Sequence, residues 1–363
     1  MQSAEGTGRF ATCDGERGEA LRLFGTPLRQ NIAGARAALG RLPRKNFISA
    51  YVDLWPTDSE GTFVAAMARA ITESMSSSVE KALETAKKLF GSLSPSVTVN
   101  EEGKPTLAFG LAKHARIDPV LEEVLETPAK IAAKGGPRVA VVLDEFQQVL
   151  EYGSDRVERK LRSVIQTHRQ VSYVFLGSRK HLIQKMVLDR NRPLYRAGGH
   201  YPLGPIAEKH WQPFIRSRFA DAEKRIDEQE IHDLCEMTQG HPFYTQHLCH
   251  VLWELCERKA KVTAEMMRTA VKVLLDRETY AYTALWESLT IPQKRFLKGL
   301  AAEAAGVKVF GGEFVSRYGL SSASNAQRAV EALLGKDIID RDNVSFLITD
   351  RFFRLWIQSA QLS

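Results

Sequence analysis

The sequence predicts an α/β fold: a parallel sheet with helices on both faces, followed by a helical region and a smaller C-terminal part. The first observation is that three apolar runs, at 47–54, 139–143 and 171–176, alternate with helical stretches. Strands and helices in alternation are typical of a parallel sheet with helices packed on its two faces. The second observation is a helical pattern throughout 207–288, after which a β-ribbon appears only near the C-terminus.

Length and composition indicate a globular protein of more than one domain. The 363 residues exceed one ordinary core, so two or three domains are expected. The sequence has four irregularly spaced cysteines, which favours a reducing compartment over a disulfide scaffold. It has no apolar stretch of membrane-spanning length and no apolar core of a secretory signal at the N-terminus. We therefore expect a cytoplasmic protein without membrane contact. A net charge of +7 permits an anionic partner such as DNA without requiring one.

The first predicted strand covers Phe47 to Leu54 and ends at Trp55-Pro56. Ser59 is a candidate N-cap for the helix that follows. A buried stripe at helical spacing supports that helix: Phe63, Met67, Ala70 and Ile71. Residues 75–138 are predicted to be mostly helical, with breaks at turns near 94 and 104.

The most informative stretch runs from Arg138 to Gln147, where an apolar run ends in Asp144 and Glu145. Such a run predicts a central strand that is buried on both faces. Carboxylates at the end of a parallel strand project into the crevice where α/β proteins bind ligands. In P-loop nucleotide hydrolases the first acid helps to hold Mg²⁺ and the second polarises the attacking water. The alternative is a buried strand that ends in solvated acids.

Beyond the acids, helix and strand alternate again. A helix is predicted over Val157–His168, and an apolar strand over Val171–Leu176 that ends at Gly177-Ser178. A further short strand is predicted at His200–Leu203.

The C-terminal part predicts helices followed by a ribbon. The helices are expected at Pro292–Ala304, Gly312–Tyr318 and Ser322–Gly335, and the ribbon pairs 338–340 with 345–348. This order of elements is that of a winged helix-turn-helix.

Taken in order, these pieces resemble the archaeal-type ATPases of the STAND branch of AAA+-related P-loop proteins, over roughly Asn46 to Ile357. The segments that carry the resemblance are Phe47–Trp55, Val141–Gln147, Phe175–Arg179, Arg192–Arg196, Gly240–Tyr244 and Ile348–Trp356. The resemblance implies four parts: an aberrant N-terminal segment (1–36), a P-loop ATPase-like core (37–205), a helical lid domain (206–288) and a winged helix-turn-helix (289–363).

The resemblance also implies ATP and Mg²⁺ as cofactors and assigns roles at the sheet. Asp144 matches the Walker B acid that holds the metal, Glu145 the catalytic acid, and Ser178 the polar sensor of the γ-phosphate. Arg192 and Arg196 lie where arginines reach a phosphate, in cis or from a neighbouring subunit. Ordinary surface charge beside a proline turn is the alternative for both arginines.

The tripeptide Gly240-His241-Pro242 resembles the turn of the lid domain that packs near the nucleotide. In this interpretation His241 contacts a phosphate. The alternative is that it caps a helix.

The Gly-rich phosphate loop of this family is missing from its expected place before Asn46. That loop holds phosphates with backbone N–H groups, a lysine and a hydroxyl, yet no Gly-Lys-Thr or Gly-Lys-Ser occurs in the 363 residues. The one candidate stretch offers Gly25, Arg29 and Gly34 but no lysine. Weak ATP binding and slow or absent hydrolysis are therefore expected.

The same stretch suggests how the loop was lost. Read one nucleotide later with suitable synonymous codons, residues 25–34 give Ala-Pro-Arg-Tyr-Gly-Lys-Thr-Ser-Leu-Val, a well-formed phosphate loop. Our hypothesis is that residues 1–36 are a shifted-frame translation, and the alternative is a genuine family member whose loop has degenerated. The DNA sequence across codons 25–34 decides between them.

In a winged helix-turn-helix, the second helix presents polar side chains to the major groove of DNA. The candidates for this role are Ser322, Ser324, Asn325, Gln327 and Arg328. Glu331 on the same helix, with Asp340 and Asp342 in the wing, would repel phosphate. A winged helix that contacts a protein partner is therefore the alternative.

Two further patterns favour packing over chemistry. The set His247, Cys249, His250 and Cys256 resembles metal ligands, but the histidines and cysteines diverge on a helix, so a lid core is favoured over a zinc site. Helical spacing also predicts a core from Trp211, Phe214, Ile215 and Phe219.

Two functions remain. The leading hypothesis is an ATPase-family protein that acts as a nucleotide-controlled switch, whose winged helix reports the nucleotide state to DNA or a protein partner. The alternative is a non-enzymatic DNA- or protein-binding regulator on a degenerate ATPase scaffold. ATP turnover, and its loss on Glu145→Gln, separates the two.

Overall fold

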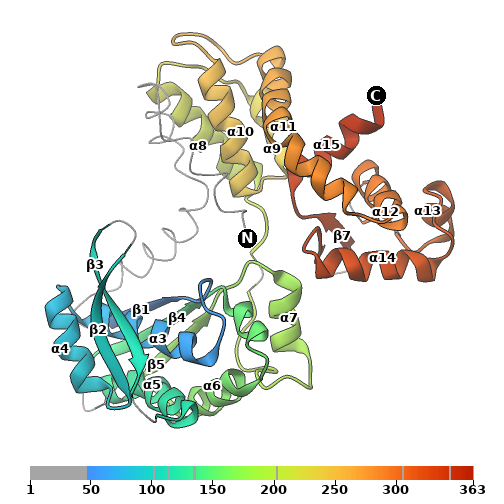
Figure 1. Ribbon diagram of the computed structural model, residues 1–363. Coiled ribbons are helices and arrows are strands. Elements are labelled where there is room, and N and C mark those ends of the chain that lie inside the picture. The colour runs from blue at the N-terminus through green and yellow to red at the C-terminus, as the bar shows by residue number, and fades with distance from the viewer. Residues whose placement is uncertain are drawn as a thin grey trace. The chain divides into compact units, whose positions relative to one another are not determined.

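The computed structural model describes residues 47–100, 103–112, 115–133, 136–201, 203–304, 306–342 and 345–362. These residues form two compact units, an α/β unit up to Tyr201 and a helical unit from Leu203 onward (Figure 1). The candidate phosphate-loop residues Gly25, Arg29 and Gly34 lie outside the described residues.

The α/β unit contains a parallel sheet of three described strands (Figure 1). Strand β4 (Arg138–Asp144) lies in the middle, between β1 (Phe47–Asp53) and β5 (Val171–Phe175). All three strands were predicted, and their parallel pairing confirms the predicted α/β class.

Helices follow the strands as the alternation predicts. They are α3 (Glu60–Met75), α4 (Val79–Leu89), α5 (Ile117–Ala132), a 3₁₀ helix (Phe146–Tyr152), α6 (Arg156–Thr167) and α7 (Lys180–Leu188). Helix α3 begins at the predicted cap, because Ser59 Oγ accepts a hydrogen bond from the backbone N–H of Thr62. Its predicted stripe, Phe63, Met67, Ala70 and Ile71, is buried.

The sheet has one face that is packed more completely than the other. Helices α3 and α5 lie against the strands, and the main core includes Val52, Val141 and Leu143, whose side chains share one face. On the opposite face Val142 is buried as well, whereas Val174 in β5 is 42% exposed. Strand β4 is thus the buried central strand that its apolar run predicted.

The expectation that 75–138 is mostly helical, with breaks at turns near 94 and 104, was right for α4 and α5 but wrong between them. Between these two helices the chain forms an antiparallel hairpin of β2 (Leu93–Val99) and β3 (Pro105–Leu111) (Figure 1). Pro95 signalled a break, but an edge strand tolerates proline because its N–H need not pair within the sheet. The hairpin is anchored by packing: the rings of Phe90 and Phe109 lie 5.9 Å apart.

The short strand predicted at His200–Leu203 was also wrong for the residues that are described. His200, Tyr201 and Leu203 belong to no strand. Tyr201 is 86% exposed and Leu203 83% exposed, so the apolar character of this segment does not reflect burial in a sheet.

The helical unit begins with four helices and continues into a winged-helix arrangement. The first four are α8 (Glu208–Asp221), α9 (Glu228–Thr238), α10 (Pro242–Leu255) and α11 (Ala264–Glu287). Then follow α12 (Ile291–Ala302), α13 (Gly312–Arg317), α14 (Ala323–Gly335), the ribbon β6 (Ile339–Asp342) and β7 (Ser345–Ile348), and α15 (Arg351–Leu362). The final helix was not predicted as an element of its own.

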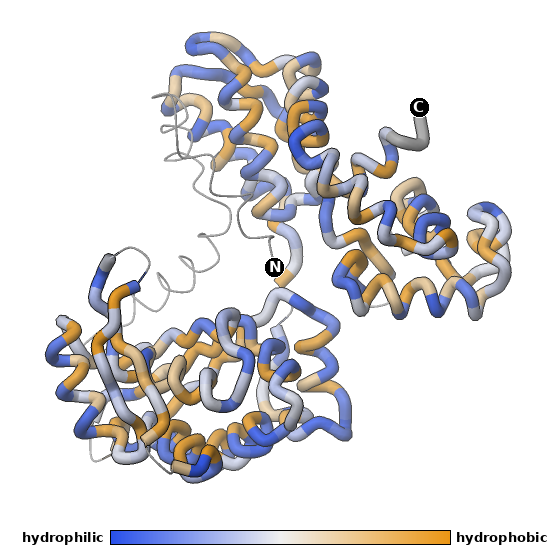
Figure 2. The backbone as a smooth tube through the Cα atoms, viewed as in Figure 1, coloured by the Kyte–Doolittle hydropathy of each residue, from blue (hydrophilic) through white to orange (hydrophobic). Residues whose placement is uncertain are grey.

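A single hydrophobic core runs through the helical unit from Trp211 to Ile357. Hydrophobic and hydrophilic residues alternate along its helices, as Figure 2 shows. Trp211, Ile215 and Phe219 are buried and Phe214 packs against them, which confirms the predicted core. Among the described residues, no helix combines the length and the apolar character that a membrane span requires.

Candidate functional site

The acid pair lies where the central strand ends. Asp144 is the last residue of β4, and Glu145 follows in the left-handed region, with φ 52° and ψ 43°. Neighbouring backbone fixes this bend, because the Leu54 N–H donates to Asp144 O at 3.1 Å and the Phe146 N–H to Leu176 O at 2.8 Å. Both carboxylates are thereby held at the C-terminal edge of the parallel sheet, which is where α/β folds bind ligands.

Hydrogen bonds join three of the predicted site residues. Ser178 Oγ donates to Glu145 Oε2 at 2.8 Å, and the Glu145 N–H donates to Asp144 Oδ1 at 3.0 Å. The structure therefore brings Asp144, Glu145 and Ser178 together from two adjacent strands.

Two further side chains at this edge were missed by the sequence reasoning. Tyr51 donates its hydroxyl to Asp144 Oδ2, and the Gln147 amide donates to Glu145 Oε2. A signal for Tyr51 existed: it pairs with Val142, so it shares a sheet face with Asp144 two residues on. Gln147 carried no comparable signal, since its contact depends on the bend at Glu145.

Gln147 is packed tightly beside the turn that carries Ser178. It is 3% exposed, and among the described residues its Oε1 has no hydrogen-bond partner. A Cβ at Gly177 would lie 2.4 Å from that oxygen and 2.7 Å from Ile183 Cδ1. Only glycine fits at 177 without displacing the amide that holds Glu145.

The two predicted phosphate arginines have other contacts. Arg192 forms an ion pair with the fully buried carboxylate of Glu158 on α6, whose pKa is raised by burial and lowered in part by Arg192. Arg196 is in the left-handed region (φ 52°), and its guanidinium lies 5.2 Å from the centre of the Tyr195 ring. Among the described residues, neither arginine forms a hydrogen bond or ion pair with Asp144 or Glu145.

In the helical unit, the turn at Gly240-His241 is fixed by close packing. Gly240 has φ 64°, and a Cβ there would lie 2.4 Å from Ile206 O, so glycine is required. Gly240 O accepts hydrogen bonds from the Ile206 N–H and from Trp211 Nε1, both at 3.1 Å. His241 precedes α10 without a side-chain capping bond, and its ring centre lies 4.9 Å from that of Tyr244.

Helix α14 presents a polar face to solvent. Ser322, Ser324, Gln327 and Arg328 are exposed, while Asn325 is half-buried. Part of this face is used internally: Ser322 Oγ caps the helix by accepting from the Asn325 N–H at 3.1 Å, and Gln327 Nε2 donates to Glu331 at 3.2 Å. Ser324 and Arg328 are the residues that remain most available to a partner.

The described residues contain no cluster of three or more histidine, cysteine or acidic side chains arranged to hold a metal. Cys249 and Cys256 are buried in the core of the helical unit, and burial raises the pKa of both thiols. They pack as apolar residues, as the sequence favoured.

Comparison with known proteins supports the architecture. A model described as a probable winged helix domain matches residues 280–359. No curated protein sequence matches the chain. A Walker-type ATPase of Pyrococcus abyssi superposes with a TM-score of 0.55 at 13% identity, covering 89% of this chain and 86% of that one.

Two solved structures from Aeropyrum pernix are more distant. The ORC2 protein, solved with ADPNP and ADP, has a TM-score of 0.46 at 13% identity, covering 92% of this chain and 83% of its own. The ORC1 protein, solved in complex with DNA, has a TM-score of 0.41 at 14% identity, covering 97% and 95%.

The chain thus shares its fold with a Walker-type ATPase and matches a probable winged helix domain in its C-terminal part. The resemblance that the sequence suggested is thereby confirmed as a shared fold.

Proposed function

We propose that the chain is an ATP-binding ATPase of the AAA+/STAND type that acts as a nucleotide-controlled switch, impaired here by loss of the phosphate loop. The observation that carries this proposal is the bonded network of Asp144, Glu145 and Ser178 at the C-terminal edge of the sheet. In this proposal 37–205 holds the nucleotide, 206–288 acts as the lid, and 289–363 is the output module.

The donor set at this edge fits a magnesium ion and its waters. Mg²⁺ prefers hard oxygen ligands and retains several waters, and the half-buried Asp144 carboxylate supplies such oxygens. When bound, Mg²⁺ would neutralise charge on the phosphates. Asp144 would hold the metal, while Tyr51 fixes the orientation of that carboxylate through Oδ2.

Glu145 is arranged to act on a water. Its Oε2 accepts hydrogen bonds from both Ser178 and Gln147, which fixes the carboxylate and leaves Oε1 to orient a water and accept its proton. Ser178 would sense the phosphate through the same network. In this proposal Arg192 contacts a phosphate after it leaves its ion pair with Glu158, and Arg196 and His241 are further phosphate contacts.

The impairment follows from the lack of a phosphate-loop motif in the sequence. Without the lysine and the backbone cradle, ATP loses most of its phosphate contacts, and the candidates that remain are Gly25, Arg29 and Gly34. Weak binding and slow or absent turnover are the consequence. If codons 25–34 do not yield the loop one nucleotide on, the shifted-frame origin of residues 1–36 is excluded.

ATP binding and turnover by the full chain test this proposal. The expected result is weak binding, with any residual turnover lost in Glu145→Gln and retained in Glu151→Gln, an exposed acid of the following 3₁₀ helix. A millimolar-or-tighter ATP complex with normal turnover would overturn the impairment. Turnover that survives Glu145→Gln would remove the acid pair from the mechanism.

The second candidate is a non-enzymatic DNA- or protein-binding regulator, and the exposed polar face of α14 favours it. Because the core of the helical unit is continuous, the full chain is the right sample. DNA binding predicts that the chain is retained by duplex DNA in a salt-dependent manner and that Arg328→Gln weakens retention. Retention that is absent at low salt, or equal in both proteins, argues for a protein partner instead.

A further inference from the structure

The connection between the lid helices (α8–α11) and the winged helix (α12–α15) is very short. Helix α11 continues without interruption from Ala264 to Glu287, and α12 starts at Ile291. Between them, Leu289 is buried and Thr290 forms a reciprocal capping pair with Gln293. Every residue of this connection is therefore engaged in packing or capping, and none is left as a loose linker.

Asp350 binds the two parts to each other. Its Oδ2 accepts a hydrogen bond from Tyr282 of α11 at 3.0 Å, while its Oδ1 accepts from the N–H groups of Phe352 and Phe353 at 2.8 and 3.0 Å. One carboxylate thus caps α15 and fastens that cap to α11. Burial beside Asp350 raises the pKa of Tyr282, so its hydroxyl stays protonated and remains a donor.

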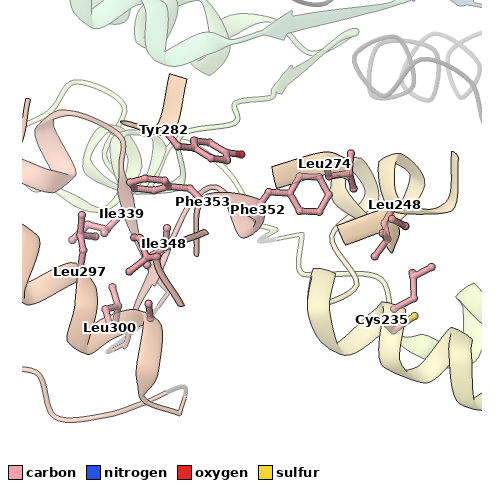
Figure 3. Packing of buried hydrophobic residues seen from close by; sticks show 14 of the residues in the cluster. Cys235, Leu248, Leu274, Tyr282, Leu297, Leu300, Ile339, Ile348, Phe352 and Phe353 are labelled. Atoms are coloured by element: carbon pink, nitrogen blue, oxygen red, sulfur yellow. The ribbon is translucent and has the colours of Figure 1, made fainter. Parts of the chain in front are cut away.

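Aromatic side chains at the start of α15 contact two of the lid helices, α10 and α11. The Phe353 ring lies 5.2 Å from Tyr282 of α11, and the Phe352 ring lies 5.1 Å from Tyr244 of α10, between ring centres. Figure 3 shows Phe353 beside Tyr282 and Phe352 turned the other way, toward Leu274. The N-terminus of α15 therefore packs against both α10 and α11.

The same contacts reach the Gly240-His241 turn. Tyr244 donates its hydroxyl to Thr349 O at 3.3 Å, and its ring centre lies 4.9 Å from that of His241. A single side chain of α10 thus links the turn before that helix to the segment that enters α15.

We propose that the lid helices and the winged helix form one rigid lever, clasped by Asp350 and Tyr282, with no hinge at 288–290. Any motion that displaces the Gly240-His241 turn then displaces α14 by the same rotation. This inference does not depend on ATP binding, because it rests on the packing of the helical unit alone.

A distance measurement between spin labels tests the lever in the full chain. Labels are placed at Gln229→Cys on α9 and Ala302→Cys on α12, both exposed positions, in a chain that also carries Cys13→Ser. The other three cysteines are buried. The expected result is a single narrow distance distribution, which stays unchanged when ATP or duplex DNA is added. A broad or two-peaked distribution in this chain would overturn the proposal.

Variants of the clasp extend the test. Tyr282→Phe combined with Asp350→Asn removes the bond from α11 and weakens the cap while preserving size, so the distribution should broaden. Glu223→Gln, which removes an exposed ion pair with Arg258 in the same unit, should leave it narrow. A clasp variant as narrow as its parent would show that Asp350 is not the fastening. If this double variant does not fold, the width of the distance distribution in the parent chain alone tests the proposal.

Discussion

The two units of the molecule hold their important residues in different ways. At the acid edge, Asp144 and Glu145 are positioned by a few polar bonds from Tyr51, Gln147 and Ser178 beside a sheet face that is partly exposed. In the helical unit, one continuous apolar core fixes every helix, and the polar clasp at Asp350 adds to it. The contrast is between side chains placed by polar bonds at a sheet edge and helices held by shared apolar packing, and both proposals above depend on it.

The largest expected effect lies in the core of the helical unit. Phe353→Ala removes a ring that is 1% exposed and contacts Tyr282 and Trp286. It should lower the free energy of unfolding by about 3–5 kcal/mol, as such truncations do in well-packed cores. Tyr280→Ala, at an 88% exposed position on α11, should change it by less than about 0.5 kcal/mol. Denaturant titration compares them, and equal losses would contradict a shared core.

The second effect is the dependence of the helical unit on pH. Burial, with help from His250 and Arg277, lowers the pKa of His247 to about 4 from 6.5. As pH falls from 6.5 toward 4, the unfolded chain binds a proton that the folded chain refuses, so stability falls. The loss approaches about 3 kcal/mol near pH 4, because each tenfold difference in proton affinity between the two states corresponds to about 1.4 kcal/mol.

Denaturant titration at pH 7 and pH 4.5 measures this loss. His247 packs against Phe352 at the start of α15. Protonation of His247 should therefore weaken the packing of α15 against α10, next to the hydrogen bond between Asp350 and Tyr282. The variant His247→Phe should show a shallower loss between the two pH values, because it cannot take up the proton. An equal loss of unfolding free energy between pH 7 and pH 4.5 in the two proteins would mean that His247 is not buried in its neutral form.

The third effect moves to the acid edge. Gly177→Ala places a methyl group against Gln147 Oε1 and Ile183, and such overpacking costs about 1–3 kcal/mol. Gly198→Ala, where no atom lies within 4 Å of the new Cβ, is the matched control and should be nearly neutral. Thermal unfolding compares the two. If both behave alike, the turn is less tightly packed around Gln147 than the structure indicates.

The smallest effect concerns the helix that follows β1. Ser59→Ala removes the capping bond to the Thr62 N–H and should cost about 1 kcal/mol. Thr98→Ala on the exposed face of the β2–β3 hairpin removes a hydroxyl without a capping role and should cost less. Denaturant midpoints measured side by side test this pair, and a Ser59 variant as stable as the parent would mean that α3 does not need its cap.

Features that depend on neighbouring residues could be predicted from the sequence, whereas features that depend on contacts between residues far apart in the sequence could not. The three parallel strands and the Ser59 cap depend on local patterns, and all were predicted. The β2–β3 hairpin was missed because it is held by long-range packing of Phe109 on Phe90. At the site, the sequence put Asp144, Glu145 and Ser178 at the ends of two neighbouring strands, and the structure joins them by hydrogen bonds. The contact of Tyr51 and the pairing of Arg192 with Glu158 depend on segments that are distant in the sequence.

The proposed metal-nucleotide site can be probed by a titration with Mn²⁺ and ATP, in which Mn²⁺ replaces Mg²⁺ and water-proton relaxation reports the bound ion. We expect weak binding by the unmodified chain that Asp144→Asn abolishes, since Asp144 remains while the sequence contains no Gly-Lys-Thr or Gly-Lys-Ser. Identical curves for the two proteins would contradict a metal-nucleotide site at Asp144.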